Sequence, residues 1–585
     1  MFGALPSPQI IRSCLLPAFR RPRPLAALAL TAALAAALPV KAQEAGLAGA
    51  YLAARQASMT SDYREAATYY ARALAADPAN PRLMENALTA FVGLGDVASA
   101  IPVARRLQSA GQDNQIAHMV LLADQVERGA FAQAIDDIEA GRSAGPLLDG
   151  LMLAWGHLGL GRMSEALEAF DAAAETDWLK SFGLYHKALA LAMVGDFEGA
   201  DAIFSGEAGG QVQATRRGVI AHAAILSQLE RNEDAIAAID AVFGPDADPG
   251  IVDLRRRLAE GETLRFDMIE TPREGAAEVF YTLASALSGD AVDSYTLIYS
   301  RLAEYLAPDN TDAMLMSAAL LESQRQYVLA SETYSRVPED DPAYYAAVLG
   351  QAEALRESGD ADAAIEVLRA LAETHPDIAV VHVTLGDTLR RLERFEEARQ
   401  AYDNAIALLG EPERRQWIVY YARGIVNERI DRWEAAEADF RKALELEPDQ
   451  PQVLNYLGYS YVEMQTNLDE ALDMIERAVE ARPNDGYITD SLGWVLYRLG
   501  RYREAVPQME RAAELEPVDP IVNDHLGDVY WAVGRQLEAR FQWRRALSFD
   551  PEKDEAERIR RKLEVGLDAV LEEEGAPPLE PLNDG

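Results

Sequence analysis

Small and apolar residues recur at helical spacing along most of the 585-residue chain, in blocks of about 34 residues. The period is clearest near the C-terminus, where each position of one block has a counterpart 34 residues later. The first block reads Leu492-Gly493, Leu496, Gly500, Tyr502, Ala505, Met509, Ala512 and Pro517, and the second reads Leu526-Gly527, Tyr530, Gly534, Gln536, Ala539, Trp543, Ala546 and Pro551. Each block predicts a pair of helices that ends at a proline, which cannot continue a helix.

In each block, small residues mark the place where the two helices cross, because only small side chains let two helix backbones approach closely. Gly493 and Ala505 are the small residues of one block, and Met509 fills the space beside the crossing. Gly500 permits the turn between the two helices. The pattern matches Trp-x2-Leu-Gly-x2-Tyr, followed by Ala-x3-Phe and Pro, so the chain is identified as a member of the tetratricopeptide repeat family.

The same frame recurs through nearly the whole chain, for example in the units around Tyr63 with Ala66 and around Gly424 with Trp433. About 14 units are expected. The resemblance to the family implies an all-α fold, a right-handed superhelical solenoid of about 14 helix pairs in two sub-solenoids. Because each repeat contacts only its neighbours, such a solenoid presents a long concave surface to an extended partner.

Two interruptions of the period divide the chain. Between about Ala241 and Gly275 it contains FGPDADPG, a short helical stretch and TPREG, which predict a junction between two sub-solenoids. A charged amphipathic stretch over 554–571 follows the last repeat and is expected to cap its open face. The predicted parts are a signal peptide (1–42), an N-terminal sub-solenoid (43–260), a junction (261–275), a C-terminal sub-solenoid (276–552), and a capping helix with an acidic tail (553–585).

The first 42 residues predict export. They contain five basic residues and no acidic one, then an apolar run over 25–38, then Val40-Lys41-Ala42 as a site of small residues for cleavage after Ala42. The run is shorter than the roughly 20 residues of a membrane-spanning helix, although an uncleaved anchor stays the alternative. The only cysteine, Cys14, precedes the apolar run, so no lipid anchor is expected. A chain exported without disulfides fits a bacterial periplasm, and peripheral association with the outer membrane stays open.

The charge of the exported chain argues against nucleic acid as a partner. Without the five basic residues of the signal, 50 basic residues stand against 95 acidic ones. Such a surface repels phosphate backbones and anionic lipid headgroups. The acidity serves either solubility alone or the attraction of basic partners.

Motifs for enzyme chemistry are missing or lack the structural context that they need. The sequence has no H-E-x-x-H, no phosphate-binding loop and no C-x-x-C. One G-x-S-x-G match, at 141–145, follows a helical stretch rather than a strand, so Ser143 is predicted to lie in a loop between repeats. The seven histidines are scattered, and His375 and His382 show no spacing typical of a metal site. No catalytic residue, cofactor or metal is therefore expected.

A second stripe on the first helix of each C-terminal repeat carries the candidate binding residues. Positions 5, 9 and 12 of a repeat share one helix face because they are spaced by four and three residues. In the family this face lines the concave groove, and aromatic rings beside carboxylates or amides suit peptide recognition. The alternative is that the rings pack against the next repeat. The candidates are Tyr421, Asn455, Tyr459, Tyr487, Asp490, Trp494, Tyr497, Asp524, Asp528 and Trp531.

Residues 454–505 and 524–547 resemble the C-terminal part of a bacterial periplasmic adaptor, the tetratricopeptide lipoprotein that binds a carboxyl-terminal-processing protease. The resemblance implies a non-enzymatic scaffold with protein or peptide partners, among them such a protease and the substrates presented to it. The chain departs from that adaptor because it lacks the lipoprotein cysteine. Two alternatives stay open, a scaffold for polysaccharide synthesis or export machinery and, least favoured, an enzyme.

Overall fold

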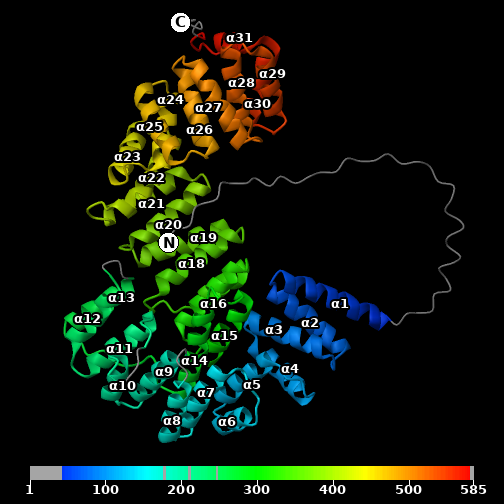
Figure 1. Ribbon diagram of the computed structural model, residues 1–585, viewed down its shortest axis with the longest axis vertical. Coiled ribbons are helices and arrows are strands. Elements are labelled where there is room, and N and C mark those ends of the chain that lie inside the picture. Colours follow the sequence, from blue (N-terminus) through cyan, green and yellow to red (C-terminus); the bar gives the residue numbers. More distant parts are fainter. Residues whose placement is uncertain (1–41, 176–178, 208–211, 245–247, 580–585) are drawn as a thin grey trace, which may run out of the picture. The chain divides into compact units, whose positions relative to one another are not determined.

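The computed structural model describes residues 42–175, 179–207, 212–244 and 248–579, and every regular element in these ranges is helical (Figure 1). The predicted all-α fold of helix pairs is confirmed. The predicted signal peptide lies outside the described residues except for Ala42, which begins the first helix.

The described helices form two compact units, and each unit combines two segments of the chain. Unit 1 contains the residues up to Gln213 together with Asp267–Ala307, and unit 2 contains Ala214–Phe266 together with Pro308 and all that follows. The helices of unit 1 are α1 (Ala42–Met59), α2 (Tyr63–Ala76), α3 (Pro81–Leu94), α4 (Val97–Ser109), α5 (Gln115–Glu127), α6 (Phe131–Glu139), α7 (Pro146–Gly159), α8 (Met163–Ala173), α9 (Lys180–Met193), α10 (Phe197–Phe204), α14 (Pro272–Leu287) and α15 (Asp293–Leu306).

Unit 2 holds the repeats that the sequence marks most clearly. Its helices are α11 (Arg216–Gln228), α12 (Asn232–Val242), α13 (Pro249–Ala259), α16 (Thr311–Ser323), α17 (Tyr327–Tyr334), α18 (Tyr344–Glu357), α19 (Ala361–Thr374), α20 (Ala379–Arg391), α21 (Phe395–Leu408), a short 3-10 helix η1 (Arg414–Gln416), α22 (Trp417–Arg429), α23 (Trp433–Leu446), α24 (Pro451–Glu463), α25 (Leu468–Ala481), α26 (Gly486–Arg498), α27 (Tyr502–Leu515), α28 (Pro520–Ala532), α29 (Gln536–Leu547), α30 (Lys553–Val565) and α31 (Leu567–Glu573).

Consecutive helices pack as pairs because a glycine on the first helix meets a large side chain of the second. A methyl group on Gly424 would come within 2.6 Å of the Phe440 ring, and one on Gly527 within 2.5 Å of the Trp543 ring. Both rings are fully buried. The prediction that small residues mark the helix crossings is thereby confirmed for α22–α23 and α28–α29.

Local capping sets where the first helices of these repeats begin. Asp485 precedes α26 and accepts the backbone N–H of Ile488, while Asp519 precedes α28 and accepts those of Ile521 and Val522. These carboxylates satisfy N–H groups that have no partner inside the helix. These two repeats therefore fix the start of their first helices, and with it the face that positions 5 and 9 occupy.

Unit 1 encloses two of its own helices. α14 packs against α5, α7 and α9, and α15 packs against α3 and α5. The contact is specific, because the Tyr185 hydroxyl donates to the buried Glu278 carboxylate at 2.8 Å and the Trp155 ring lies directly over Gly275. Helices α3, α5, α7 and α9 are the first helices of the N-terminal repeats, so their common face is covered by a segment of the same chain.

The predicted domain boundaries, 43–260 and 276–552 about a junction at 261–275, stay a prediction. By packing contacts, α14 and α15 group with the N-terminal repeats, while α11–α13 group with unit 2. The stretch between α13 and α14 contains no helix. The predicted cap over 554–571 consists of two helices, α30 and α31, which meet at Gly566 with φ of +88°.

The helix crossing yields a test of stability. Gly424→Ala should lower the free energy of unfolding by about 1–3 kcal/mol, because the new methyl group overlaps the Phe440 ring. Gly49→Ala, on the exposed face of α1 with no atom within 4 Å, should instead stabilise its helix by about 0.5–1 kcal/mol. Urea unfolding followed by circular dichroism measures both. An unchanged midpoint for Gly424→Ala would contradict the crossing geometry.

Candidate peptide-binding groove

A groove with a volume of about 680 Å³ lies in unit 2 along α22, α24, α26 and α28. Most of its residues come from the first helices of four successive repeats, so the helix pairing described above determines its walls. The lining residues are Glu428, Arg429, Asp431, Trp433, Asn455, Tyr456, Tyr459, Ser460, Glu463, Met464, Tyr487, Asp490, Ser491, Asp519, Ile521 and Val522.

Neutral aromatic donors hold three of the groove carboxylates in place. The Tyr456 hydroxyl donates to Glu428 at 3.2 Å, the Trp494 indole N–H donates to Glu463 at 2.8 Å, and the Tyr487 hydroxyl donates to Asp519 at 3.4 Å. A hydrogen bond from a neutral group orients a carboxylate without cancelling its charge. Burial raises the pKa of Tyr456, as does the nearby Glu428, so this phenol keeps its proton.

Family profiles of the tetratricopeptide repeat match residues 51–115, 315–379, 377–449, 421–486 and 491–553. Together these matches cover just over half of the chain. The chain belongs to the tetratricopeptide repeat family. The repeats that line the groove, α22 to α28, lie within the matched ranges apart from residues 487–490, and the family is made of scaffolds suited to protein binding.

The chain is also similar to individual proteins, at low sequence identity. The chain is 29% identical over 184 residues to the TPR repeat-containing protein PA4667 of Pseudomonas aeruginosa, which is 31% of this chain and 30% of that protein. The match thus spans about a third of the length of that relative. Among solved structures, the Cut9–Hcn1 tetramer of the APC/C is 13% identical with a TM-score of 0.36, covering 89% of this chain and 96% of that chain. YrrB, a TPR protein with an unusual peptide-binding site, is 22% identical with a TM-score of 0.28, covering 34% of this chain and 99% of that one.

Four of the ten predicted binding residues line the groove: Asn455, Tyr459, Tyr487 and Asp490. Tyr487 is half exposed, whereas Asp490 is buried at the groove wall. Burial raises the pKa of Tyr459, and the Glu463 and Asp490 carboxylates beside it raise that pKa further. Asn455 contributes a buried Oδ1 atom that accepts no hydrogen bond from the described residues. Tyr421 lies half-buried beside the groove, with its ring edge-on to Tyr456 at a centroid distance of 5.9 Å.

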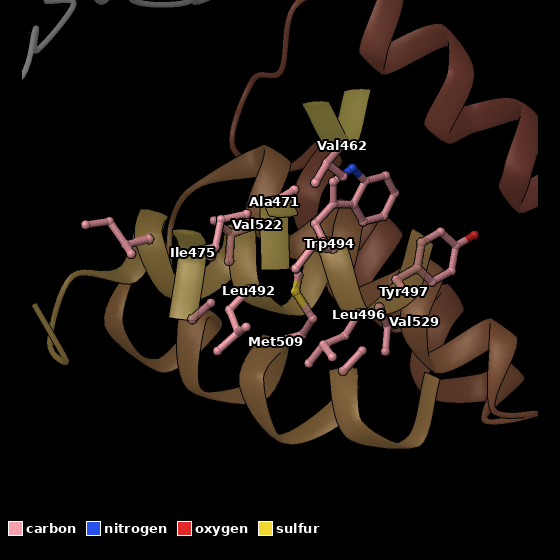
Figure 2. Close-up of a cluster of buried hydrophobic side chains, with 14 of the residues drawn as sticks. Val462, Ala471, Ile475, Leu492, Trp494, Leu496, Tyr497, Met509, Val522 and Val529 are labelled. Carbon is pink, nitrogen blue, oxygen red and sulfur yellow. The ribbon is translucent and has the colours of Figure 1, made fainter. Parts of the chain in front are cut away.

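Trp494 and Tyr497 are packed between repeats instead of facing the groove. Figure 2 shows both rings within the buried cluster of α24, α26 and α28 side chains. The Trp494 ring stacks on His525 at a centroid distance of 3.9 Å and on Tyr497 at 4.7 Å. Their exposed fractions are 7% and 6%, so in this structure the packing alternative describes these two residues.

His525 links the repeat of α28 to the repeat of α26 by charge. Its Nδ1 atom lies 3.0 Å from Asp490 Oδ2. Burial lowers the pKa of His525, but the carboxylates of Asp490, Asp524 and Asp528 together outweigh burial and leave the pKa above its ordinary value. The raised pKa favours the protonated imidazole, the form that balances the charge of Asp490 from behind the groove wall.

Asp524, Asp528 and Trp531 are engaged by the cap. The fully buried Lys562 ammonium of α30 lies 2.7 Å from Asp524 and 2.6 Å from Asp528. Asp528 also accepts the Trp543 indole N–H at 2.8 Å, and the Trp531 indole N–H donates to Asp568 at 2.9 Å. These three predicted binding residues thus hold α30 and α31 onto the last repeat.

Sequence reasoning missed most of the groove carboxylates. Glu428 occupies position 12 of its repeat, but Asp431, Glu463 and Asp519 lie outside positions 5, 9 and 12. In a chain with 95 acidic residues, none of them stands out by type. Including position 13 in the predicted helix face would have added Glu463 to the candidates.

Ser143 and the two nearest histidines, which the sequence singled out, lie outside the groove. Ser143 lies in the loop between the helices α6 and α7 and donates to Asp149, so the predicted loop between repeats is confirmed. His375 contacts Thr374 and His382 contacts the Pro376 carbonyl. Within the described residues, no helix is long and apolar enough to cross a membrane, and no cluster of three His, Cys, Asp or Glu side chains could hold a metal ion.

The buried ammonium of the cap yields a second test. Lys562→Met should destabilise the packing of α30 and α31 by about 3–5 kcal/mol, because Asp528 would keep a buried charge without its cation. Arg561→Met on the same helix is the control: Arg561 pairs with Glu573 at a half-exposed site, where solvent screens the pair and little or no loss is expected. Hydrogen exchange of the amides in α30 and α31 measures the difference.

The loss caused by Lys562→Met should shrink as the pH falls. Burial and the neighbouring Asp528 raise the pKa of Asp524, and the Lys562 ammonium opposes them. Without the ammonium, the folded state takes up protons at higher pH than the unfolded chain, so its stability rises on acidification. Equal protection of α30 in both variants at neutral pH would show that Lys562 is not the group that holds the cap.

Proposed function

We propose that this chain is a non-enzymatic, exported protein-binding scaffold whose groove along α22–α28 holds an extended segment of a partner protein. The observation that supports this is the composition of the groove. Tyrosine rings, half-exposed or at its walls, alternate with carboxylates and with an asparagine oxygen that lacks a donor. Aromatic rings supply contact area at low entropy cost, and the polar atoms match the N–H groups of a peptide.

The two units differ in whether their repeats are already occupied. In unit 1 the first helices α3, α5, α7 and α9 are covered by α14 and α15. In unit 2 the first helices α22, α24, α26 and α28 line the groove. We therefore assign partner binding to the groove of unit 2.

We further propose that the scaffold works in a bacterial periplasm as an adaptor that presents substrates to a carboxyl-terminal-processing protease. The support is the resemblance of residues 454–505 and 524–547 to such an adaptor, together with the signal-like composition of residues 1–42. The groove lies largely within the first of these stretches.

Photo-crosslinking from the groove tests the binding role. The mature chain carries a benzoyl-phenylalanine in place of Tyr487, which is 51% exposed in the groove, or in place of Phe541, which is 62% exposed on α29 outside it. We expect a partner protein to be crosslinked in the envelope of the producing cell from position 487 and not from position 541. Both chains should keep the helicity of the parent.

The identity of the crosslinked protein separates the proposed roles. A protease or its substrates would support the adaptor, whereas a polysaccharide polymerase or exporter would support the alternative scaffold. Crosslinks that are absent at position 487, or equal at 487 and 541, would overturn the groove as the binding site.

Export has its own test. The chain purified from its natural cell should begin at Gln43, because cleavage is predicted after Ala42. N-terminal sequencing and cell fractionation measure this directly. An intact N-terminus in the cytosolic fraction would contradict the periplasmic role.

A further inference from the structure

The groove carries a charge imbalance that its own residues do not correct. Five carboxylates line it, and Arg429 is the only basic residue among the described residues of its lining. Glu428 lies 3.7 Å from the Arg429 guanidinium, which is itself 61% exposed. The other donors to Glu428, Glu463 and Asp519 described above are neutral: phenol, indole and, for Asp519, two backbone N–H groups. Negative charge therefore remains concentrated where a peptide would lie.

Position 5 of the neighbouring repeats contacts a basic side chain of this chain. Position 5 of three successive repeats carries Asn455, Asp490 and Asp524. Asp490 accepts from the raised-pKa imidazole of His525, and Asp524 accepts from the Lys562 ammonium. Two of the three positions thus pair with a basic side chain that this chain supplies. At the third, Asn455, the Oδ1 atom is buried and has no donor among the described residues.

The register of the repeat explains why no basic side chain of this chain lies beside the third position, Asn455. His525 fills the space beside Asp490, and the residue 34 positions earlier is Ser491. The Ser491 hydroxyl donates to the Tyr487 carbonyl at 3.0 Å and carries no ring. Ser491 and Asn455 both line the groove, so at this repeat a serine stands at the groove wall where the next repeat has an imidazole.

We propose that the groove binds a partner peptide through one basic side chain, lysine or arginine, held beside Asn455 and Glu463. This rests on the proposed function, since it names the chemistry of the partner for the same site. The Glu463 carboxylate accepts the N–H groups of the side chain, and Asn455 lines the same groove. The tyrosine rings at 456 and 459 pack against its alkyl part and attract its charge. Arg498, whose guanidinium lies 5.9 Å from the Trp494 ring centroid, is outside the lining and leaves the groove net negative.

The probe is a random decapeptide library with blocked termini, displayed on beads and selected with the labelled mature chain. Selected peptides are resynthesised with each basic residue replaced by methionine, and their affinities are measured by fluorescence anisotropy at two salt concentrations. One basic position should dominate, with an affinity loss of about tenfold on replacement, and binding should weaken as salt rises.

Two matched variants of the chain locate the contact. Glu463→Gln keeps an acceptor for the Trp494 indole but removes one of the five carboxylates that line the groove, whereas Glu514→Gln removes a 70%-exposed carboxylate on α27 outside the groove. In the Glu463→Gln chain the lysine and methionine peptides should bind with nearly equal affinity. In the Glu514→Gln chain the lysine peptide should still bind about tenfold more tightly than the methionine peptide.

The outcomes separate this inference from the proposed function. Peptides that bind at the groove, compete with crosslinking from position 487 and tolerate methionine at every basic position would overturn the inference and leave the function standing. Dependence on a basic residue that is unchanged by Glu463→Gln would overturn it as well. If the library yields no peptide that competes with crosslinking, and crosslinking itself fails, the function and the inference both fall.

Discussion

The close crossing of two helices inside each repeat is the constraint on which the rest of this structure depends. At Gly424 and Gly527 the absent side chain lets a ring from the second helix, Phe440 or Trp543, lie directly against the backbone of the first. That contact fixes the rotation of the first helix about its axis. It therefore decides which residues face the next repeat and which face the groove. The chemistry of the groove follows from this rotation as much as from the identities of its residues.

The same repeat produces two different surfaces in the two units. In unit 1 the chain places α14 and α15 over its own first helices, and buried polar contacts such as Tyr185 to Glu278 make that arrangement specific. In unit 2 two basic side chains of the same chain contact position 5 of the last two repeats. Lys562 contacts Asp524 in the last repeat, and His525 contacts Asp490 in the one before. Asp490, which contacts His525, still lines the groove, and at Asn455, one repeat earlier, no described residue donates to the side-chain oxygen.

The sequence predicts the helix pairs well because close crossing requires small residues at fixed positions, which leaves a period of 34 residues. The sequence predicts the residues of the candidate site less completely. Asn455, Tyr459, Tyr487 and Asp490 line the groove, since their helix face is set by the same period. Trp494 and Asp528 are buried by His525 and Lys562, and Lys562 lies outside the repeat, so no periodic signal connects them. The packing of α14 onto the N-terminal repeats is equally hidden, because it joins segments about a hundred residues apart.

Hydrogen exchange of the mature chain, with and without a saturating selected peptide, tests most directly whether partners bind where the first helices of unit 2 leave space. The account predicts slower exchange in α24 and α26 on binding, with no change in α3, α5 and α7, whose shared face is covered by α14 and α15. Protection that appears instead in the N-terminal helices, or only in the second helices α25 and α27, would contradict the assignment of the groove as the binding site.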